Sequence, residues 1–150
     1  MKILITGANG FLGYHLSFLL LHKGHVVIAT GKDECRLPFT RGKNFIYETL
    51  DFTDPRNVQS LFATYRPEIV VHAGAMSKPD ECELQQEPAH TINVKGTGHL
   101  LNASAACNSF FVFLSTDFIF SGEKGMYREE DETGPVNYYG QTKLEAEALV

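Results

Sequence analysis

The sequence predicts an α/β fold built on a doubly wound parallel sheet of five or more strands. Short apolar runs alternate with segments of helical periodicity along the chain, which is the pattern of consecutive β-α-β units. A glycine-rich turn follows the first apolar run and opens the first helix. Because 150 residues fit one domain, we interpret residues 1–150 as a single domain.

The first two strands are predicted from apolar runs on either side of a helical segment. Lys2–Thr6 is a continuous apolar run, and His25–Thr30 is a second one. Between them, Phe11–Lys23 has helical periodicity and Gly24 ends the helix, with four leucines expected on one side: Leu12, Leu16, Leu19 and Leu20. Residues 31–43 are rich in charges, glycine and proline, so we expect a loop there and a short or missing second crossover helix.

Three more strands are predicted further along the chain, at Phe45–Leu50, Ile69–His72 and Phe110–Ser115. Pro55 opens a helix that runs to about Tyr65, and Asp54 stands in its N-cap position. A long helix is expected from about Pro88 to Ala106.

The last part of the chain is predicted to be a loop and a helix. Residues 121–137 are rich in glycine and acidic residues and are expected to form a loop. A helix that begins near Tyr138 is expected to be still running at Val150. A crossover helix normally leads to another strand, so we expect the domain to be truncated in its last helix.

The composition argues against several classes of function. A net charge of −5 argues against a surface for nucleic acid or anionic membranes, because both require a basic patch. No run approaches the roughly 20 apolar residues needed to cross a bilayer. The cysteines are odd in number and widely spaced, at Cys35, Cys82 and Cys107, and the six histidines lack metal-ligand spacing. We therefore expect no metal site and a reducing, cytoplasmic setting.

The glycine-rich turn is the first motif with a chemical meaning. Gly7 allows a tight turn, Gly10 lets the backbone approach a pyrophosphate, and Gly13 lets the helix pack closely on the sheet. Free backbone N–H groups and the positive end of the helix dipole then hold the phosphates. This context predicts a Rossmann-like, NAD(P)-binding domain whose turn residues contact the cofactor: Gly7, Asn9, Gly10, Phe11, Leu12 and Gly13.

The end of the second strand bears on the choice between NADP and NAD. No acidic residue stands at the strand tip, Thr30-Gly31, where a carboxylate would bind the ribose 2′-hydroxyl. Lys32 and Arg36 stand where a 2′-phosphate would lie, so NADP is the expected cofactor and NAD the alternative. In that alternative, Asp33 or Glu34 folds back onto the ribose and Lys32 is a solvated surface charge.

A second motif, Tyr139-Gly140-Gln141-Thr142-Lys143, places a phenol and an ammonium one turn apart on one helix face. A free tyrosine has a pKa of about 10, which is too high for efficient proton exchange near neutrality. A fixed positive charge nearby stabilises the phenolate and lowers that pKa. Thr116 follows the fifth strand, and strands of an open α/β sheet bind ligands at their carboxyl ends, so its hydroxyl can bond a substrate carbonyl.

These motifs together resemble the extended short-chain dehydrogenase/reductase family. Five features occur along this chain in the same order as in that family. They are the Gly-x-x-Gly-x-x-Gly spacing at residues 7–13, Ala73-Gly74-Ala75, Asn93, Ser115-Thr116-Asp117 and the Tyr139/Lys143 pair. Within that family, residues 115–122 and 135–147 are similar to the dTDP-4-dehydrorhamnose reductase branch. Two positions depart from the usual pattern, Ser121 in place of aspartate and Gly74 in place of alanine. These departures leave the mechanism intact but affect which substrate the resemblance implies.

The resemblance implies a role for each matching residue. Asp51 and Phe52 would lie beside the adenine ring, and the other cofactor contacts would come from Ala73, Gly74, Ala75 and Asn93. Thr116 would hydrogen-bond a keto oxygen, and Tyr139 would give that oxygen a proton. Lys143 would hold the nicotinamide ribose and tune Tyr139. A small C-terminal substrate domain would lie outside these 150 residues.

The expected function is therefore NADP-dependent reduction of a 4-keto nucleotide sugar, with Thr116, Tyr139 and Lys143 as catalytic residues. A nucleotide sugar is the expected partner, and a homodimer is left open. One alternative is another nucleotide-sugar epimerase or dehydratase of the same family. The other is a non-catalytic, cofactor-binding regulatory subunit, against which the presence of all three catalytic residues argues.

Overall fold

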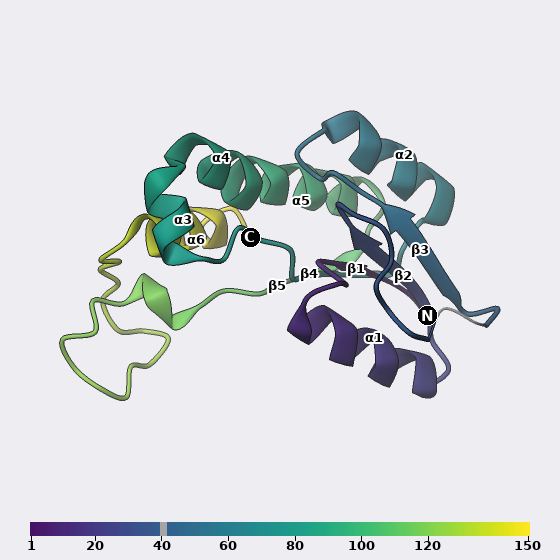
Figure 1. The fold of residues 1–150 in the computed structure, drawn as a ribbon, viewed down its shortest axis with the longest axis horizontal. Helices are drawn as coiled ribbons and strands as arrows, with labels where there is room; N and C mark the ends of the chain where they lie inside the picture. The colour runs from purple at the N-terminus through teal and green to yellow at the C-terminus, as the bar shows by residue number, and fades with distance from the viewer. Residues whose placement is uncertain (40–41) are drawn as a thin grey trace. The chain divides into compact units, whose positions relative to one another are not determined.

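A parallel five-stranded sheet organises the protein (Figure 1). The computed structural model describes residues 1–39 and 42–150. The strands lie in the order β3-β2-β1-β4-β5, and every neighbouring pair is parallel, which confirms the predicted fold class. The strands are β1 (Lys2–Thr6), β2 (Val26–Gly31), β3 (Phe45–Thr49), β4 (Ile69–His72) and β5 (Phe110–Phe113).

Helical segments connect the strands. They are α1 (Phe11–His22), α2 (Pro55–Tyr65), α3 (Pro79–Leu84), α4 (Gln86–His90), a π-helical turn η1 (Thr91–Lys95), α5 (Gly96–Ala106), a 3-10 turn η2 (Asp117–Ile119) and α6 (Tyr138–Glu147). Among the helices of the described residues, none has the length and apolar character needed to span a bilayer. The chain divides into two compact units, the sheet unit (Met1–Gly74 and His99–Leu114) and the helical unit (Ala75–Gly98 and Ser115–Val150).

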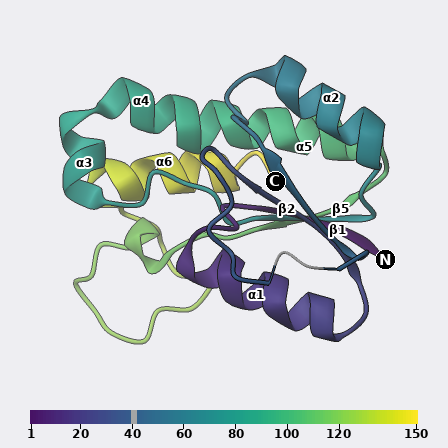
Figure 2. The ribbon, with the colours of Figure 1, turned by 45° about the vertical axis from the view of Figure 1, so that its right-hand side comes forward.

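Helices cover both faces of the sheet unit, α1 on one face and α2 with residues 99–106 of α5 on the other (Figures 1 and 2). Successive side chains of a strand point to opposite faces, so Ile3 and Ile5 pack in the core beside α1, whereas Leu4 packs in the core beside α2. The strands are therefore apolar at consecutive positions because both of their faces are buried.

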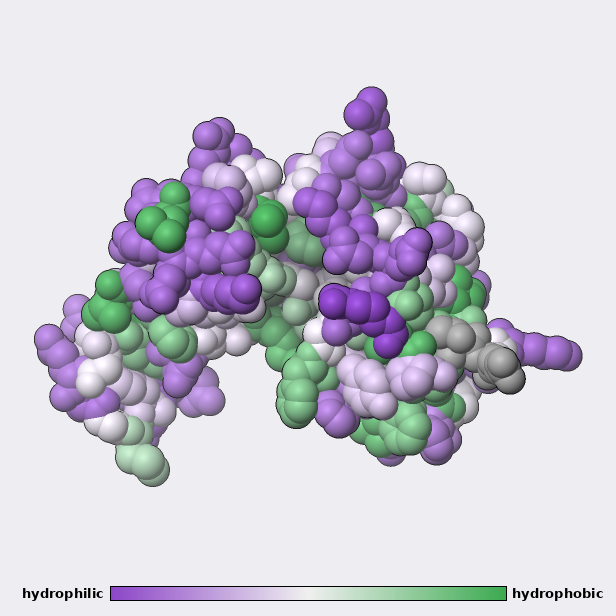
Figure 3. All heavy atoms as spheres, in the orientation of Figure 1, coloured by the Kyte–Doolittle hydropathy of each residue, from purple (hydrophilic) through white to green (hydrophobic). Residues whose placement is uncertain are grey.

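The buried side of helix α1 was predicted only in part, because Leu16 and Leu20 pack against the core as expected. Leu12 and Leu19, which were expected on the buried side, are 45% and 50% exposed, whereas Gly13 and Ser17 are buried. The helix is apolar on all sides, so periodicity alone does not define a buried face, and Figure 3 shows hydrophobic surface over α1. Close backbone packing fixes the rotation instead, because a Cβ at residue 13 would lie 2.3 Å from the Gly7 oxygen.

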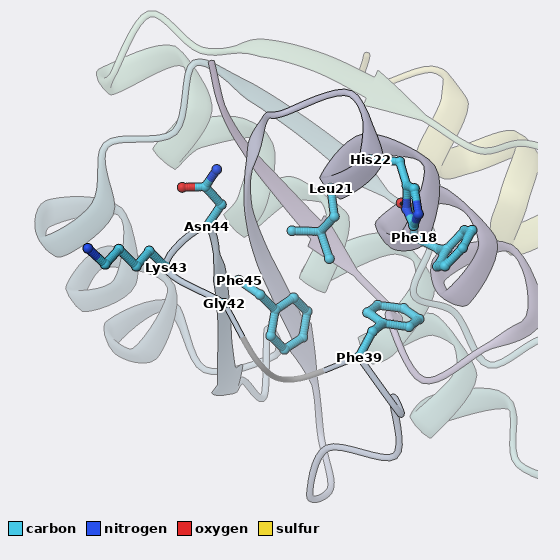
Figure 4. Close-up of a pocket in the computed structure, with 8 residues that line it drawn as sticks. All are labelled: Phe18, Leu21, His22, Phe39, Gly42, Lys43, Asn44 and Phe45. Carbon is cyan, nitrogen blue, oxygen red and sulfur yellow. The ribbon is translucent and has the colours of Figure 1, made fainter.

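The connection between β2 and β3 has no helix in its described residues, 32–39 and 42–44, as predicted. Residues 40–41 of the expected loop lie outside the described residues. Phe39 packs between α1 and β3, with its ring 5.7 Å from the ring of Phe18 in α1 and 5.9 Å from that of Phe45 in β3. These three rings surround a hollow of about 560 Å³ at the amino-terminal ends of the strands (Figure 4).

The predicted helix from Pro88 to Ala106 differs in the structure. It begins at Gln86, and the π-helical turn η1 interrupts it between α4 and α5. A π-helical turn widens the helix by one residue and is frequent at functional sites. Asn93 lies in this turn and is only 2% exposed. Helix α3, which precedes α4, was not predicted.

Two other elements end at least two residues before their predicted carboxyl ends. β5 was expected to reach Ser115 but ends at Phe113, which pairs with His72, the last residue of its neighbour β4. α6 was expected to continue through Val150 but ends at Glu147. The N–H groups of Leu149 and Val150 bond to oxygens three residues earlier, so the last turn tightens as helix ends commonly do. Residues 121–137 form neither helix nor strand, as predicted.

Candidate cofactor and catalytic residues

The glycine-rich turn joins β1 to α1 in the sheet unit. Gly7 has a φ of +68°, and a Cβ there would lie 2.7 Å from the Ala73 oxygen, so the turn requires glycine for both reasons. At Gly10 the steric requirement for glycine is weaker, since a Cβ would meet only the Gly7 oxygen, at 3.2 Å. Gly10 is also the N-cap of α1 and has no side chain that could compete for the first-turn N–H groups of Phe11 and Leu12. This geometry suits an anion held by backbone N–H groups.

The exit from β4 packs directly against this turn. A Cβ on Gly74 would lie 2.8 Å from Cε1 of Phe52 and 3.2 Å from Oγ1 of Thr6, which explains glycine where alanine is commoner. The Gly74 N–H donates to Thr6 Oγ1 at 3.1 Å, and the same hydroxyl bonds His72 Nδ1 at 2.6 Å. Ala73 and Gly74 thus lie beside Gly7 in the sheet unit.

Asp51 and Lys32 follow the carboxyl ends of β3 and β2, two neighbouring strands of the sheet unit. Asp51 Oδ1 accepts from the Thr53 N–H at 3.0 Å and from its hydroxyl at 2.6 Å, and the Thr53 hydroxyl bond is the largest cause that lowers the Asp51 pKa. Its second oxygen is 3.9 Å from Lys32 Nζ, whose side chain is 76% exposed. Asp51 therefore caps its own loop, and its other oxygen faces the lysine that was predicted to bind a 2′-phosphate.

The side chain of Asn9 bonds backbone groups of the loop that carries Arg36, also in the sheet unit. The Arg36 N–H donates to Asn9 Oδ1 at 3.0 Å. The Asn9 amide nitrogen donates to the Glu34 oxygen at 3.0 Å and to Tyr47 Oη at 2.9 Å. The side chain of Asn9 is thus engaged in holding the loop after β2, a role that the motif alone did not indicate.

Thr116 and Tyr139 come together in the helical unit. Thr116 is the N-cap of η2, where its hydroxyl accepts from the Phe118 N–H at 3.3 Å. Tyr139 lies in the first turn of α6, which Asn137 caps by accepting from the Gly140 N–H at 2.8 Å. The rings of Phe118 and Tyr139 are 5.7 Å apart in an edge-to-face contact. A short turn after residue 115 and the start of α6 therefore present one hydroxyl and one phenol together.

The pKa of Tyr139 differs from the expected direction. Burial raises it above the ordinary value and outweighs the hydrogen bond with Thr116, which lowers it. Lys143 is only 4% exposed, and burial lowers its pKa to about 8 although the nearby Glu147 carboxylate raises it. Lys143 therefore keeps most of its positive charge at neutral pH and loses that charge as the pH rises above about 8.

Asn93 supports helix α6, which carries Tyr139, from within the helical unit. Its Oδ1 accepts from the Met76 N–H at 2.8 Å, and its Nδ2 donates to the Met76 oxygen at 3.0 Å and to Thr142 Oγ1 at 2.9 Å. The Thr142 hydroxyl in turn donates to the Tyr139 oxygen at 2.8 Å. Both amide hydrogens of Asn93 are therefore engaged by the protein, so its geometry fits a structural support better than the direct cofactor contact that the resemblance implied.

The predicted residues fall into two groups. The sheet unit holds those of the glycine turn, Lys32, Arg36, Asp51, Phe52, Ala73 and Gly74, and the helical unit holds Ala75, Asn93, Thr116, Tyr139 and Lys143. Tyr47 and Thr142 were not predicted, although Thr142 stands inside the Tyr139–Lys143 motif. Within residues 1–39 and 42–150, no group of three or more His, Cys, Asp or Glu side chains could hold a metal ion.

Comparison with known proteins gives consistent matches. A family model described as RmlD substrate binding domain matches residues 1–150. Methionine adenosyltransferase 2 subunit beta of Pongo abelii is 32% identical over 149 residues, which are 99% of this chain and 42% of that protein. The structure of a hypothetical dTDP-4-dehydrorhamnose reductase from Sulfolobus tokodaii is 38% identical, with a TM-score of 0.85, over 99% of this chain and 51% of that one.

A dTDP-4-dehydrorhamnose reductase from Bacillus anthracis, solved in complex with NADP, is 28% identical, with a TM-score of 0.80. That match covers 99% of this chain and 48% of the other. The chain therefore spans about half the length of the proteins that it matches.

Proposed function

Because this chain belongs to the RmlD substrate binding domain family, we propose that it binds NADP and reduces the keto group of a nucleotide sugar, with Tyr139 as proton donor. The observation that carries the proposal is the pairing of Tyr139 with the Thr116 hydroxyl at the start of α6. Proteins named dTDP-4-dehydrorhamnose reductase are similar over 99% of the chain, and one of them is solved with NADP.

The chain's own residues can perform the proton transfer of such a reduction. The bound cofactor supplies a hydride for the keto carbon. Thr116 donates a hydrogen bond to the keto oxygen, and the Tyr139 hydroxyl passes its proton to that oxygen as the carbonyl becomes an alcohol. Burial raises the pKa of Tyr139, so the phenol holds its proton at neutral pH before the transfer. The Lys143 ammonium then stabilises the phenolate that remains.

The residues of the sheet unit fit a dinucleotide phosphate group. Gly7 and Gly13 hold the turn where a Cβ would strike backbone atoms, which brings the start of α1 close to β1. The Gly10 N-cap leaves the first-turn N–H groups without a side-chain competitor. Lys32 and Arg36 on the following loop supply two positive charges for a 2′-phosphate, which favours NADP over NAD.

A second function is favoured by one specific match, to methionine adenosyltransferase 2 subunit beta at 32% identity. In that case the chain would bind a cofactor as a subunit of another enzyme, without turnover of its own. The two functions make different demands on Tyr139, because only the reductase needs its transferable proton.

Substitution of Tyr139 by phenylalanine tests the reductase. We expect turnover of NADPH with a 4-keto nucleotide sugar to fall by about 10²-fold or more, the usual contribution of a positioned general acid, with cofactor affinity nearly unchanged. Tyr138→Phe is the matched control, since it removes a hydroxyl from the adjacent residue of α6 and should leave turnover near that of wild type. Turnover of Tyr139→Phe within about tenfold of wild type would contradict the role of proton donor.

The length of the assayed chain is part of this proposal. The relatives are about twice as long, so we propose that a further region similar to theirs completes the substrate site. The assay is run on residues 1–150 and on a chain extended to the length of those relatives. We expect turnover only from the longer chain, and full activity of residues 1–150 would contradict the need for a second region.

A further inference from the structure

Tyr47 and Asn9 hold the loop after β2 from two sides. Tyr47 Oη donates to the Asp33 oxygen at 2.7 Å and accepts from Asn9 Nδ2 at 2.9 Å. Asn9 also donates to the Glu34 oxygen at 3.0 Å and accepts from the Arg36 N–H at 3.0 Å. Three backbone groups of residues 33–36 are therefore bonded to two side chains that belong to the glycine turn and to β3.

The sheet brings Tyr47 to this position. Tyr47 pairs with Ala29 in the parallel register of β2 and β3, one strand away from the end of β1. A Cβ on Gly31 would lie 2.5 Å from Tyr47 Oη and 3.1 Å from Asn9 Nδ2, so glycine at position 31 makes room for the Tyr47 hydroxyl. Burial raises the pKa of Tyr47, which keeps the phenol protonated and able to donate at neutral pH.

The bonded segment carries the two charges that bear on cofactor choice. Arg36 is bonded through its own N–H, and Lys32 directly precedes Asp33, whose oxygen Tyr47 holds. A loop that is already ordered loses less conformational freedom when a ligand binds than a free loop does. That advantage would apply to a 2′-phosphate bound by Lys32 and Arg36, and not to the rest of the dinucleotide.

We propose that Tyr47 is a positioning residue that, together with Asn9, presets residues 32–36 and thereby sets the preference for NADP over NAD. This inference rests on the proposed function, because it assumes that Lys32 and Arg36 bind the 2′-phosphate. A merely structural role would instead weaken the binding of both cofactors equally, because both share the pyrophosphate and the adenine.

Tyr47→Phe is the first test, because it removes the hydroxyl and keeps the ring in its packing. From the net value of the hydrogen bonds lost, we expect the Kd for NADPH to rise about tenfold while that for NADH changes by less than about twofold. Tyr65→Phe is the matched control, since the Tyr65 hydroxyl of α2 bonds Glu48 beside Tyr47 and touches none of residues 32–36 in the described contacts. Both Kd values should be unchanged in this control.

A second readout needs no cofactor. Limited digestion of the free protein with trypsin, followed by mass spectrometry, measures cleavage after Lys32 and after Arg36. We expect faster cleavage at both sites in Tyr47→Phe than in wild type or in Tyr65→Phe. Gly31→Ala provides an independent variant, because its Cβ would displace the Tyr47 hydroxyl and should cause the same selective loss of NADPH affinity and the same faster cleavage.

The outcomes separate this inference from the proposed function. An unchanged ratio of the NADPH and NADH Kd values in both Tyr47→Phe and Gly31→Ala would overturn the inference, and so would unchanged cleavage. Tighter binding of NADH than of NADPH by the wild-type protein would instead contradict the proposed NADP preference. In that event the digestion still decides whether Tyr47 holds the loop.

Discussion

Alanine substitutions at Gly13 and Ser17 should change stability in opposite directions, although both residues lie on the buried face of α1 one turn apart. At residue 13 a Cβ would lie 2.3 Å from the Gly7 oxygen and 2.6 Å from the Ala8 Cα. Overpacking of a core costs about 1–3 kcal/mol, and the upper part of this range applies because backbone atoms cannot rotate away. Alanine regains about 1 kcal/mol of helix propensity over glycine, so we expect a net loss of about 2 kcal/mol.

Ser17 presents the opposite situation. Its side chain is fully buried, and its hydroxyl has no hydrogen-bond partner among the described residues. A buried unsatisfied hydroxyl costs roughly 1–3 kcal/mol, and alanine also has the higher helix propensity. Ser17→Ala removes that hydroxyl and fills nearly the same space, so we expect the free energy of unfolding to rise by about 1 kcal/mol.

Urea denaturation followed by far-UV circular dichroism measures both variants against wild type. The two should differ by about 3 kcal/mol at equal denaturant slope, which is a separation of about 1–2 M in the midpoints. Wild-type stability in Gly13→Ala would show that the turn can relax and that backbone contact does not fix the rotation of α1. A loss of stability in Ser17→Ala would show that the hydroxyl has a partner in solution.

Two further predictions concern charged residues. Lys32→Ala should weaken NADPH binding and leave NADH binding unchanged, with its largest effect at low salt, where a surface charge is least screened. Titration of both cofactors at two salt concentrations measures this effect. An equal loss of affinity for both cofactors would contradict it. Lys143 has a pKa of about 8 in the folded protein and 10.5 as its ordinary value, so the unfolded chain binds more protons between these values. The free energy of unfolding should therefore rise with pH from about 8 to 10, by at most about 3 kcal/mol for this group. Denaturation across this range should show a smaller rise in Lys143→Met, and an equal rise would assign it to other groups.

The sheet and the glycine turn could be predicted because their signals are local. A strand buried on both faces is a continuous apolar run, as Lys2–Thr6 is, and no other part of the chain is needed to recognise it. The Tyr139/Lys143 pair is likewise a spacing within one helix. Asp54 was correctly predicted as the N-cap of α2, since its side chain accepts from the Arg56 N–H.

The missed features depend on contacts that a local sequence pattern does not show. The buried face of α1 follows from contact between Gly13 and Gly7, and the helix is apolar on other faces as well. The role of Asn93 follows from bonds to Met76 and Thr142, which lie 17 and 49 residues away. Helix α3 is an exception, because Pro79 at its start, with two acidic residues after it, is a local signal that its six-residue length concealed.

The connection between β2 and β3, whose described residues hold no helix, has a consequence for the folding of the sheet. All four strand pairs are parallel, so none of them can form through a tight hairpin and each must close a longer loop. Val27 pairs with Phe45, 18 residues later, whereas Ile3 pairs with Ile69, 66 residues later. Because loop-closure entropy grows with the logarithm of loop length, joining β1 to β4 costs about 1 kcal/mol more than joining β2 to β3. The short connection therefore makes β2–β3 the pair that closes with the smallest loss of chain entropy.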